Sequence, residues 1–78
     1  MRMPKPLSGL AEGRDAQVQE VCVYGGIRRR LQDLGFIPGA RVACIQRSPL
    51  GDPTAYSIRG AVVALRAQDA SKIIVTEI

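Results

Sequence analysis

The apolar residues between positions 16 and 24 are mostly valines, and their alternation changes parity within the segment. Val18 and Cys22 share one face of an extended chain, whereas Val21 and Val23 share the other. Such a change predicts either a strand that contains a β-bulge or a strand that is buried on both faces.

The next segment has the period of a helix. Ile27, Leu31 and Leu34 recur at the i, i+4 and i+7 positions, and polar or charged residues fill the opposite side. This spacing predicts an amphipathic helix of about two turns. Gly35 suits a left-handed C-terminal cap, and Pro38 prevents the helix from resuming.

Four more strands are expected after this helix, at residues 41–47, 56–59, 62–65 and 73–78. A loop with two prolines at 48–53 separates the first two of them, and residues 67–72 favour one helical turn before the last strand. Five short antiparallel strands, with a helix after the first and a helical turn before the last, predict an all-β fold, a small β-barrel. Full or near closure of the barrel would hide its strand edges.

The whole chain of 78 residues is expected to form a single domain, 1–78. Residues 1–6 hold two prolines and two cations, which predicts a mobile tail, and residues 7–10 favour one helical turn. So small a domain has little core to spare for a buried catalytic pocket.

The absence of histidine excludes Ser/His/Asp and Cys/His catalysis, and no phosphate-binding glycine motif is present. We therefore assign no catalytic residue and no cofactor, and expect no enzyme activity. The two cysteines, Cys22 and Cys44, are far apart, and no two carboxylates within a predicted helix have the spacing of a helical metal site, so no metal ligand is assigned. Both thiols are expected to be buried and reduced, as in a cytoplasmic protein. No signal peptide or membrane-spanning apolar run is visible.

The chain has eleven basic residues, nine of them arginine, and seven acidic ones. This excess of positive charge favours an acidic partner. Arg28, Arg29 and Arg30 form a cationic patch that either meets phosphate or carboxylate groups or only faces solvent. A nucleic-acid-binding barrel would need stacking aromatic residues, and this chain has only Tyr24, Phe36 and Tyr56. Phe36 is expected instead to plug the barrel.

Several strings in order resemble one known family. The segment IRRRLQDLGFIPG at 27–39 is similar to the central RRLxDLGFxPG stretch of the FeoA family, the small ferrous iron transport protein A. LSGLAEG at 7–13, PLGDP at 49–53, YSIRG at 56–60 and ALR at 64–66 resemble the family's other strings. The resemblance extends over residues 7–75.

The resemblance implies an SH3-like barrel and a cytoplasmic regulatory role in ferrous iron uptake. The implied partner is the cytosolic G-protein region of FeoB, the Fe(II) membrane transporter, through which the chain would be peripheral to the membrane. The family is associated with transition metals, but this sequence offers no ligand set. A nucleic-acid-binding barrel and a metal-responsive regulatory domain are the alternatives.

The exposed residues within the resembling strings are the candidates for partner contact. Arg28 and Arg29 are expected on the outer face of the helix, and Leu50 and Asp52 at the rim of the proline-braced loop. Leu31, Leu34 and Phe36 are instead expected to cover one mouth of the barrel.

Overall fold

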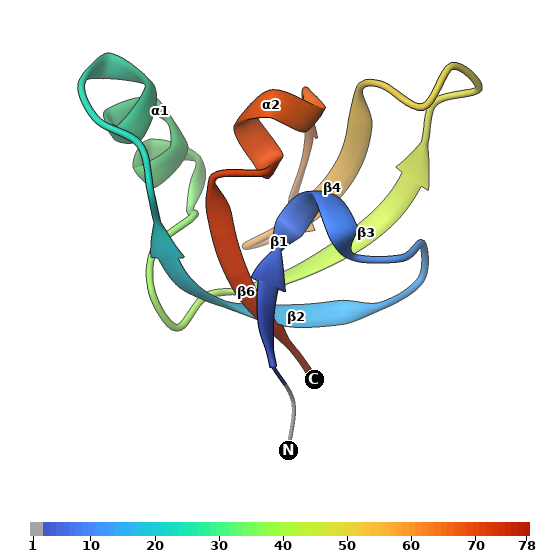
Figure 1. The fold of residues 1–78 in the computed structure, drawn as a ribbon, viewed down its shortest axis with the longest axis horizontal. Coiled ribbons are helices and arrows are strands. Elements are labelled where there is room, and N and C mark those ends of the chain that lie inside the picture. The colour runs from blue at the N-terminus through green and yellow to red at the C-terminus, as the bar shows by residue number, and fades with distance from the viewer. Residues whose placement is uncertain (1–2) are drawn as a thin grey trace.

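The computed structural model describes residues 3–78 as one antiparallel sheet with three short helical elements (Figure 1). The strands are β1 (Pro4–Pro6), β2 (Asp15–Val21), β3 (Arg41–Arg47), β4 (Thr54–Ile58), β5 (Ala61–Leu65) and β6 (Ile73–Glu77). The helical elements are the 3-10 helix η1 (Leu7–Gly9) and the α-helices α1 (Gly26–Leu34) and α2 (Ala67–Ala70). Within this part of the chain the strand order is β1-β6-β2-β3-β4-β5, and every pairing is antiparallel.

A bulge in β2 explains the change of parity in its sequence. The register of β2 against β6 shifts between Val18 and Glu20, so one extra residue is accommodated there. Val18 before the shift and Val21 and Val23 after it are therefore all buried, and Cys22 is exposed. The bulge is confirmed, and the alternative of a strand buried on both faces is excluded.

The N-terminal segment differs from its prediction as a mobile tail. Pro4–Pro6 form an edge strand that pairs with Ile74–Thr76 of β6, so the described strands number six and not five. Proline is tolerated at a sheet edge because its missing N–H is not needed there. Residues 1–2, which also belonged to that prediction, lie outside the described residues.

The core lies inside the curled sheet, and it includes Leu7 of η1, Ala70 of α2 and Phe36 from the segment that follows α1. Phe36 and Tyr56 are its largest fully buried side chains, so the prediction that Phe36 plugs the barrel is confirmed. Leu31 is buried and Leu34 is partly buried beside the core. The other large, fully buried side chains are Leu7, Leu10, Ile58, Ile73, Val18, Val42, Val75 and Cys44.

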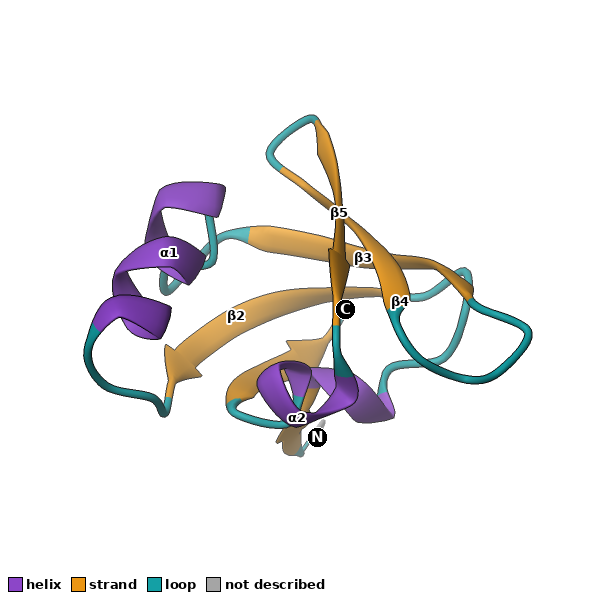
Figure 2. Cartoon of the chain, turned by 90° about the horizontal axis from the view of Figure 1, so that it is seen from above, coloured by secondary structure: helices purple, strands orange, loops and turns teal. Residues whose placement is uncertain are grey.

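The sheet ends at β5, whose only strand partner in the described chain is β4. The two strands are joined by Arg59 and Gly60, both with positive φ (50° and 82°), as a tight two-residue hairpin requires. Figure 2 shows this hairpin projecting beyond the other strands. The expectation that closure hides the strand edges is therefore wrong for β5.

Among residues 3–78, no helix is both long and apolar enough to cross a membrane.

Candidate functional site

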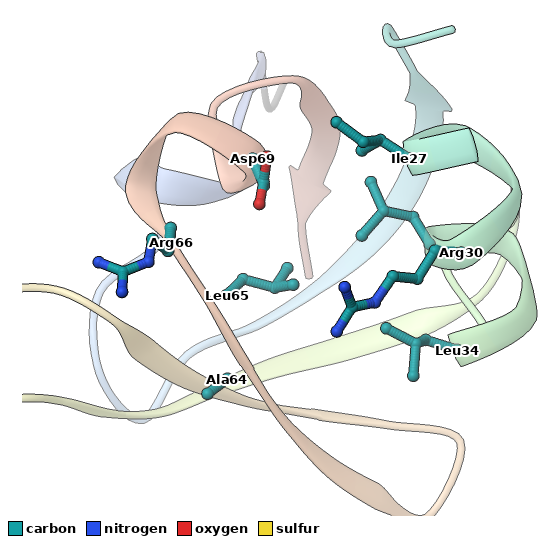
Figure 3. A pocket seen from close by; sticks show the side chains of 8 residues that line it. Ile27, Arg30, Leu34, Ala64, Leu65, Arg66 and Asp69 are labelled. Carbon is teal, nitrogen blue, oxygen red and sulfur yellow. The ribbon is translucent and has the colours of Figure 1, made fainter. Parts of the chain in front are cut away.

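A groove of about 310 Å³ separates α1 from β5 and α2 (Figure 3). We call it the α1–β5 groove. Its volume is at the small end of the range found for ligand clefts, roughly 300–1,000 Å³. Its lining residues are Ile27, Arg30, Leu31, Leu34, Ala64, Leu65, Arg66 and Asp69.

The groove exists because α1 does not pack its whole apolar stripe against the core. Leu31 is 3% exposed, Leu34 is partly buried, and Ile27 at the start of the stripe is 53% exposed. In an ordinary surface helix all three positions would face the core. The apolar side of α1 therefore forms one wall of the groove, and Leu65 lies on the opposite side.

Charged groups stand at the rim of the groove. In Figure 3 the Arg30 guanidinium points across the gap toward β5, the Asp69 carboxylate also faces the groove, and Arg66 points away. The Arg66 Nη1 atom lies 4.0 Å from Asp52 Oδ2. Arg30 makes no ion pair or side-chain hydrogen bond with any residue in the described part of the chain.

Arg28 and Arg29 are both exposed on α1, but their environments differ. The Arg28 guanidinium donates hydrogen bonds from Nη1 to the carbonyl oxygens of Val21, at 3.1 Å, and Val23, at 3.4 Å. Arg28 thus holds the end of β2 against α1. Arg29 has no such side-chain partner within residues 3–78 and is free to meet another molecule.

Leu50 and Asp52 also differ in role. Leu50 is 94% exposed at the tip of the β3–β4 loop. Asp52 Oδ1 accepts a hydrogen bond of 2.8 Å from the backbone N–H of Ala67, the first residue of α2. Asp52 therefore supplies the N-terminal cap of α2 from a distant loop and fixes the base on which Leu50 is displayed.

The structure separates the four predicted contact residues into two pairs. Figure 1 shows α1 and the β3–β4 loop on opposite sides of α2. The α1–β5 groove and its lining residues from β5 and α2 were missed by the sequence reasoning. The only signal of the groove in the sequence is Ile27. Local patterns do not predict the groove, because it depends on packing between α1 and β5, which are far apart in the chain.

The aromatic residues offer little for stacking nucleic-acid bases. Phe36 and Tyr56 are buried, and Tyr24 alone of the three is exposed, at 89%. Single strands are held by several stacking rings along a basic groove. Because two of the three aromatic rings are buried, the structure supports nucleic-acid binding less than the sequence alone does.

The two thiols lie in different environments. Cys44 is buried, as predicted, whereas Cys22 is exposed, so the prediction that it is buried is wrong. Desolvation raises the pKa of both thiols above 9.0, and at Cys22 the Glu20 carboxylate adds to the effect. In residues 3–78, no three His, Cys, Asp or Glu side chains gather where they could hold a metal ion.

Comparison with known proteins gives one family. The chain matches the FeoA domain family over residues 5–77. It is 39% identical over 67 residues to the Fe(2+) transport protein A/Fe(2+) transporter FeoB fusion protein of Porphyromonas gingivalis. The match covers 86% of this chain and 8% of that protein, so the chain spans a small part of the length of that relative.

Solved structures share the fold. The solution structure of FeoA from Chlorobium tepidum is 36% identical, with a TM-score of 0.88, over 94% of this chain and 70% of that one. The crystal structure of Stenotrophomonas maltophilia FeoA in complex with zinc is 31% identical, with a TM-score of 0.80, over 90% of this chain and 87% of that one. The latter is described as a prokaryotic SH3 domain protein. The predicted small SH3-like barrel is therefore confirmed.

Proposed function

The chain belongs to the FeoA family, and on that premise we propose that it is an accessory protein of ferrous iron transport that binds the cytosolic G-protein region of a FeoB-type transporter. It acts in the cytoplasm as a single domain and has no catalysis of its own. The P. gingivalis relative, which is named as a fusion of the two proteins, supports the pairing.

The observation that carries this proposal is the α1–β5 groove beside the cationic side of α1. An apolar depression next to unpaired arginines is typical of a protein-binding surface, since the apolar part supplies affinity and the charges orient the partner. Arg29 and Arg30 have no ion-pair partner in the described structure, so neither has to break an existing contact to bind.

The four residues proposed from the sequence lie outside the lining of the groove, on α1 and on the β3–β4 loop, and take two roles. Arg29 and Leu50 contact the partner directly, because both are exposed and the Arg29 guanidinium has no hydrogen-bond partner in the described chain. Arg28 and Asp52 are positioning residues, because their side chains hold the β2–α1 loop and the β3–β4 loop through hydrogen bonds to backbone groups.

A metal-responsive function has less support. The S. maltophilia relative was crystallised with zinc, but the described residues of this chain include no cluster that fits a metal ion. Desolvation and the Glu20 carboxylate raise the pKa of the Cys22 thiol, which disfavours the thiolate form that binds metal ions. We therefore assign no metal to the proposed mechanism.

The test is direct binding of the full chain to the isolated cytosolic region of the FeoB-type transporter from the same genome, measured by calorimetry. We expect Arg29→Glu and Leu50→Ala each to weaken binding by about tenfold or more, or about 1.4 kcal/mol. Lys72→Glu is the matched control: it makes the same charge reversal outside α1 and the β3–β4 loop and should bind like the native chain.

Two results would contradict the proposal. Native affinity in both Arg29→Glu and Leu50→Ala would remove these residues from the surface. Failure of the native chain to bind the transporter region even at low salt, where charge attraction is strongest, would overturn the proposed function itself.

A further inference from the structure

We propose that the occupant of the α1–β5 groove is an extended segment of the partner protein that adds to the sheet as a strand on the outer edge of β5. The segment carries apolar residues at alternate positions and carboxylates at its ends. The identity of the partner rests on the proposed function, whereas the mode of binding rests on the edge of β5, the groove beside it and the charge of this surface.

The first observation is that β5 has an unpaired edge. The two-residue turn pairs Ile58 with Ala61, and the register continues to Leu65. In such an antiparallel ladder alternate residues turn their backbone groups to the neighbouring strand. Val62 and Ala64 therefore direct their N–H and C=O groups away from β4. These groups have no hydrogen-bond partner within residues 3–78.

The second observation is that this edge is not protected. Natural sheet edges are usually blocked by charged residues, prolines, bulges or a covering element. The sequence of β5, AVVAL, contains no charge and no proline, and Val62 is 70% exposed. An apolar edge kept open in this way is suited to accept another strand.

The third observation is that the edge borders the groove. Ala64 and Leu65 of β5 line one side, and Ile27, Leu31 and Leu34 of α1 line the other (Figure 3). Where a strand added to β5 passes Ala64 and Leu65, every second side chain would face the apolar wall of α1. The volume of about 310 Å³ suits a few side chains of one short segment and not a folded domain.

The fourth observation concerns charge. The chain carries a net charge of +4, and α1 contains three arginines against one aspartate. Arg30 points into the groove without an ion pair in the described chain, and Asp69 is the one acid in the lining. Carboxylates at the ends of the bound segment would complement this surface and speed association.

The same charge argues against a second copy of the chain as the occupant, because two surfaces of like charge would repel each other. A helix in the groove is also less suitable, since its backbone groups are satisfied internally and would leave those of Val62 and Ala64 unpaired. Both remain outcomes that the experiment can detect.

The test begins with a random library of short linear peptides displayed on phage and selected on the full chain. Enriched peptides should have alternating apolar residues flanked by Asp or Glu. One enriched peptide is then added to the labelled protein, and amide hydrogen exchange is followed by NMR. The Val62 and Ala64 amides should exchange about tenfold slower or more in the complex, while Val63, already paired with β4, should change little.

Val62→Pro removes one outward N–H and should weaken peptide binding about tenfold, whereas Val62→Ala keeps the N–H and serves as the matched control. The hydrogen-exchange measurement uses the native chain, so it still tests the proposal if Val62→Pro fails to fold. Three results would each overturn the proposal. The selection could enrich no peptide, or the enriched peptides could bind as helices. The third result is slower exchange of the Val62 and Ala64 amides as protein concentration rises, with no peptide added.

The two proposals fail separately. If the transporter region binds the native chain while the Val62 and Ala64 amides still exchange rapidly, strand addition is wrong and the proposed function stands. If acidic peptides protect these amides but the transporter region does not bind, strand addition is supported and the proposed function is wrong.

Discussion

At the scale of single residues, Gly35 is the glycine of the described chain at which an added side chain would meet its neighbours most closely. It ends α1 with φ 112°, and its N–H donates a hydrogen bond of 3.0 Å to the carbonyl oxygen of Gln32. A Cβ atom placed on it would lie 2.8 Å from Cδ of Arg59 and 3.2 Å from Cγ1 of Ile58. The family-like LGF string is thus explained by backbone conformation and by close contact with the β4–β5 hairpin.

Gly35→Ala should lower the free energy of unfolding by about 1–3 kcal/mol, mainly because of the positive φ. The control is Gly26→Ala, at a helical position where an added Cβ meets nothing within 4 Å; it should keep or slightly raise stability. Urea denaturation of the two variants measures the difference. Equal stability of both would show that Gly35 is not under conformational constraint.

At the scale of elements, the parts that the sequence predicted are those specified by local pattern. The stripe of Ile27, Leu31 and Leu34 predicted α1, and the parity change in the valines predicted a strand with either a bulge or two buried faces, of which the bulge is present in β2. The missed parts depend on distant partners. Two of the three residues of β1 are prolines, a composition that predicts a tail, and only pairing with β6 makes the segment a strand.

The candidate site follows the same rule. The exposure of Arg29 and Leu50 follows from helix period and turn composition and could be predicted. The attachment of Arg28 to the carbonyl oxygens of Val21 and Val23, and of Asp52 to Ala67, could not. These contacts depend on where segments end in space, which no local pattern encodes.

The attachment of the β3–β4 loop to α2 makes a prediction at this scale. Asp52→Ala leaves the N–H of Ala67 without its acceptor and should cost about 0.5–2 kcal/mol of stability, as for other N-terminal caps. Asp52→Asn keeps an oxygen acceptor and should lose less. Leu50→Ala changes only an exposed side chain and should be neutral. Thermal unfolding of the three variants tests this order, and equal values for Asp52→Ala and Leu50→Ala would contradict the capping role.

At the scale of the whole molecule, Glu77 joins three distant parts of the chain. Its carboxylate accepts a hydrogen bond of 2.7 Å from Lys5 Nζ of β1 and another of 2.7 Å from Arg14 Nε, just before β2. These two hydrogen bonds lower the pKa of Glu77 from 4.5 to about 2. The native state therefore binds the proton of Glu77 less readily than the unfolded chain does.

Because the pKa of Glu77 is lower in the native state, its contribution to stability is fully present above pH 4.5 and is lost as the pH falls toward about 2. Glu77→Gln should remove this part of the pH dependence and leave stability flatter across that window. Asp33→Asn, on exposed α1, is the control. Urea unfolding at a series of pH values measures the effect, and an unchanged slope in Glu77→Gln would refute it.

The pairing of β1 with β6 has a consequence for attachment to a larger protein. Pro4 lies opposite Thr76, so the two ends of the described chain emerge side by side, and Figure 1 shows them at the end of the molecule away from α1 and α2. A linker to another domain can therefore leave from either end without crossing the groove. Such a tether would hold the groove near a target on the same polypeptide at a high effective concentration, so even weak intrinsic affinity would keep it occupied.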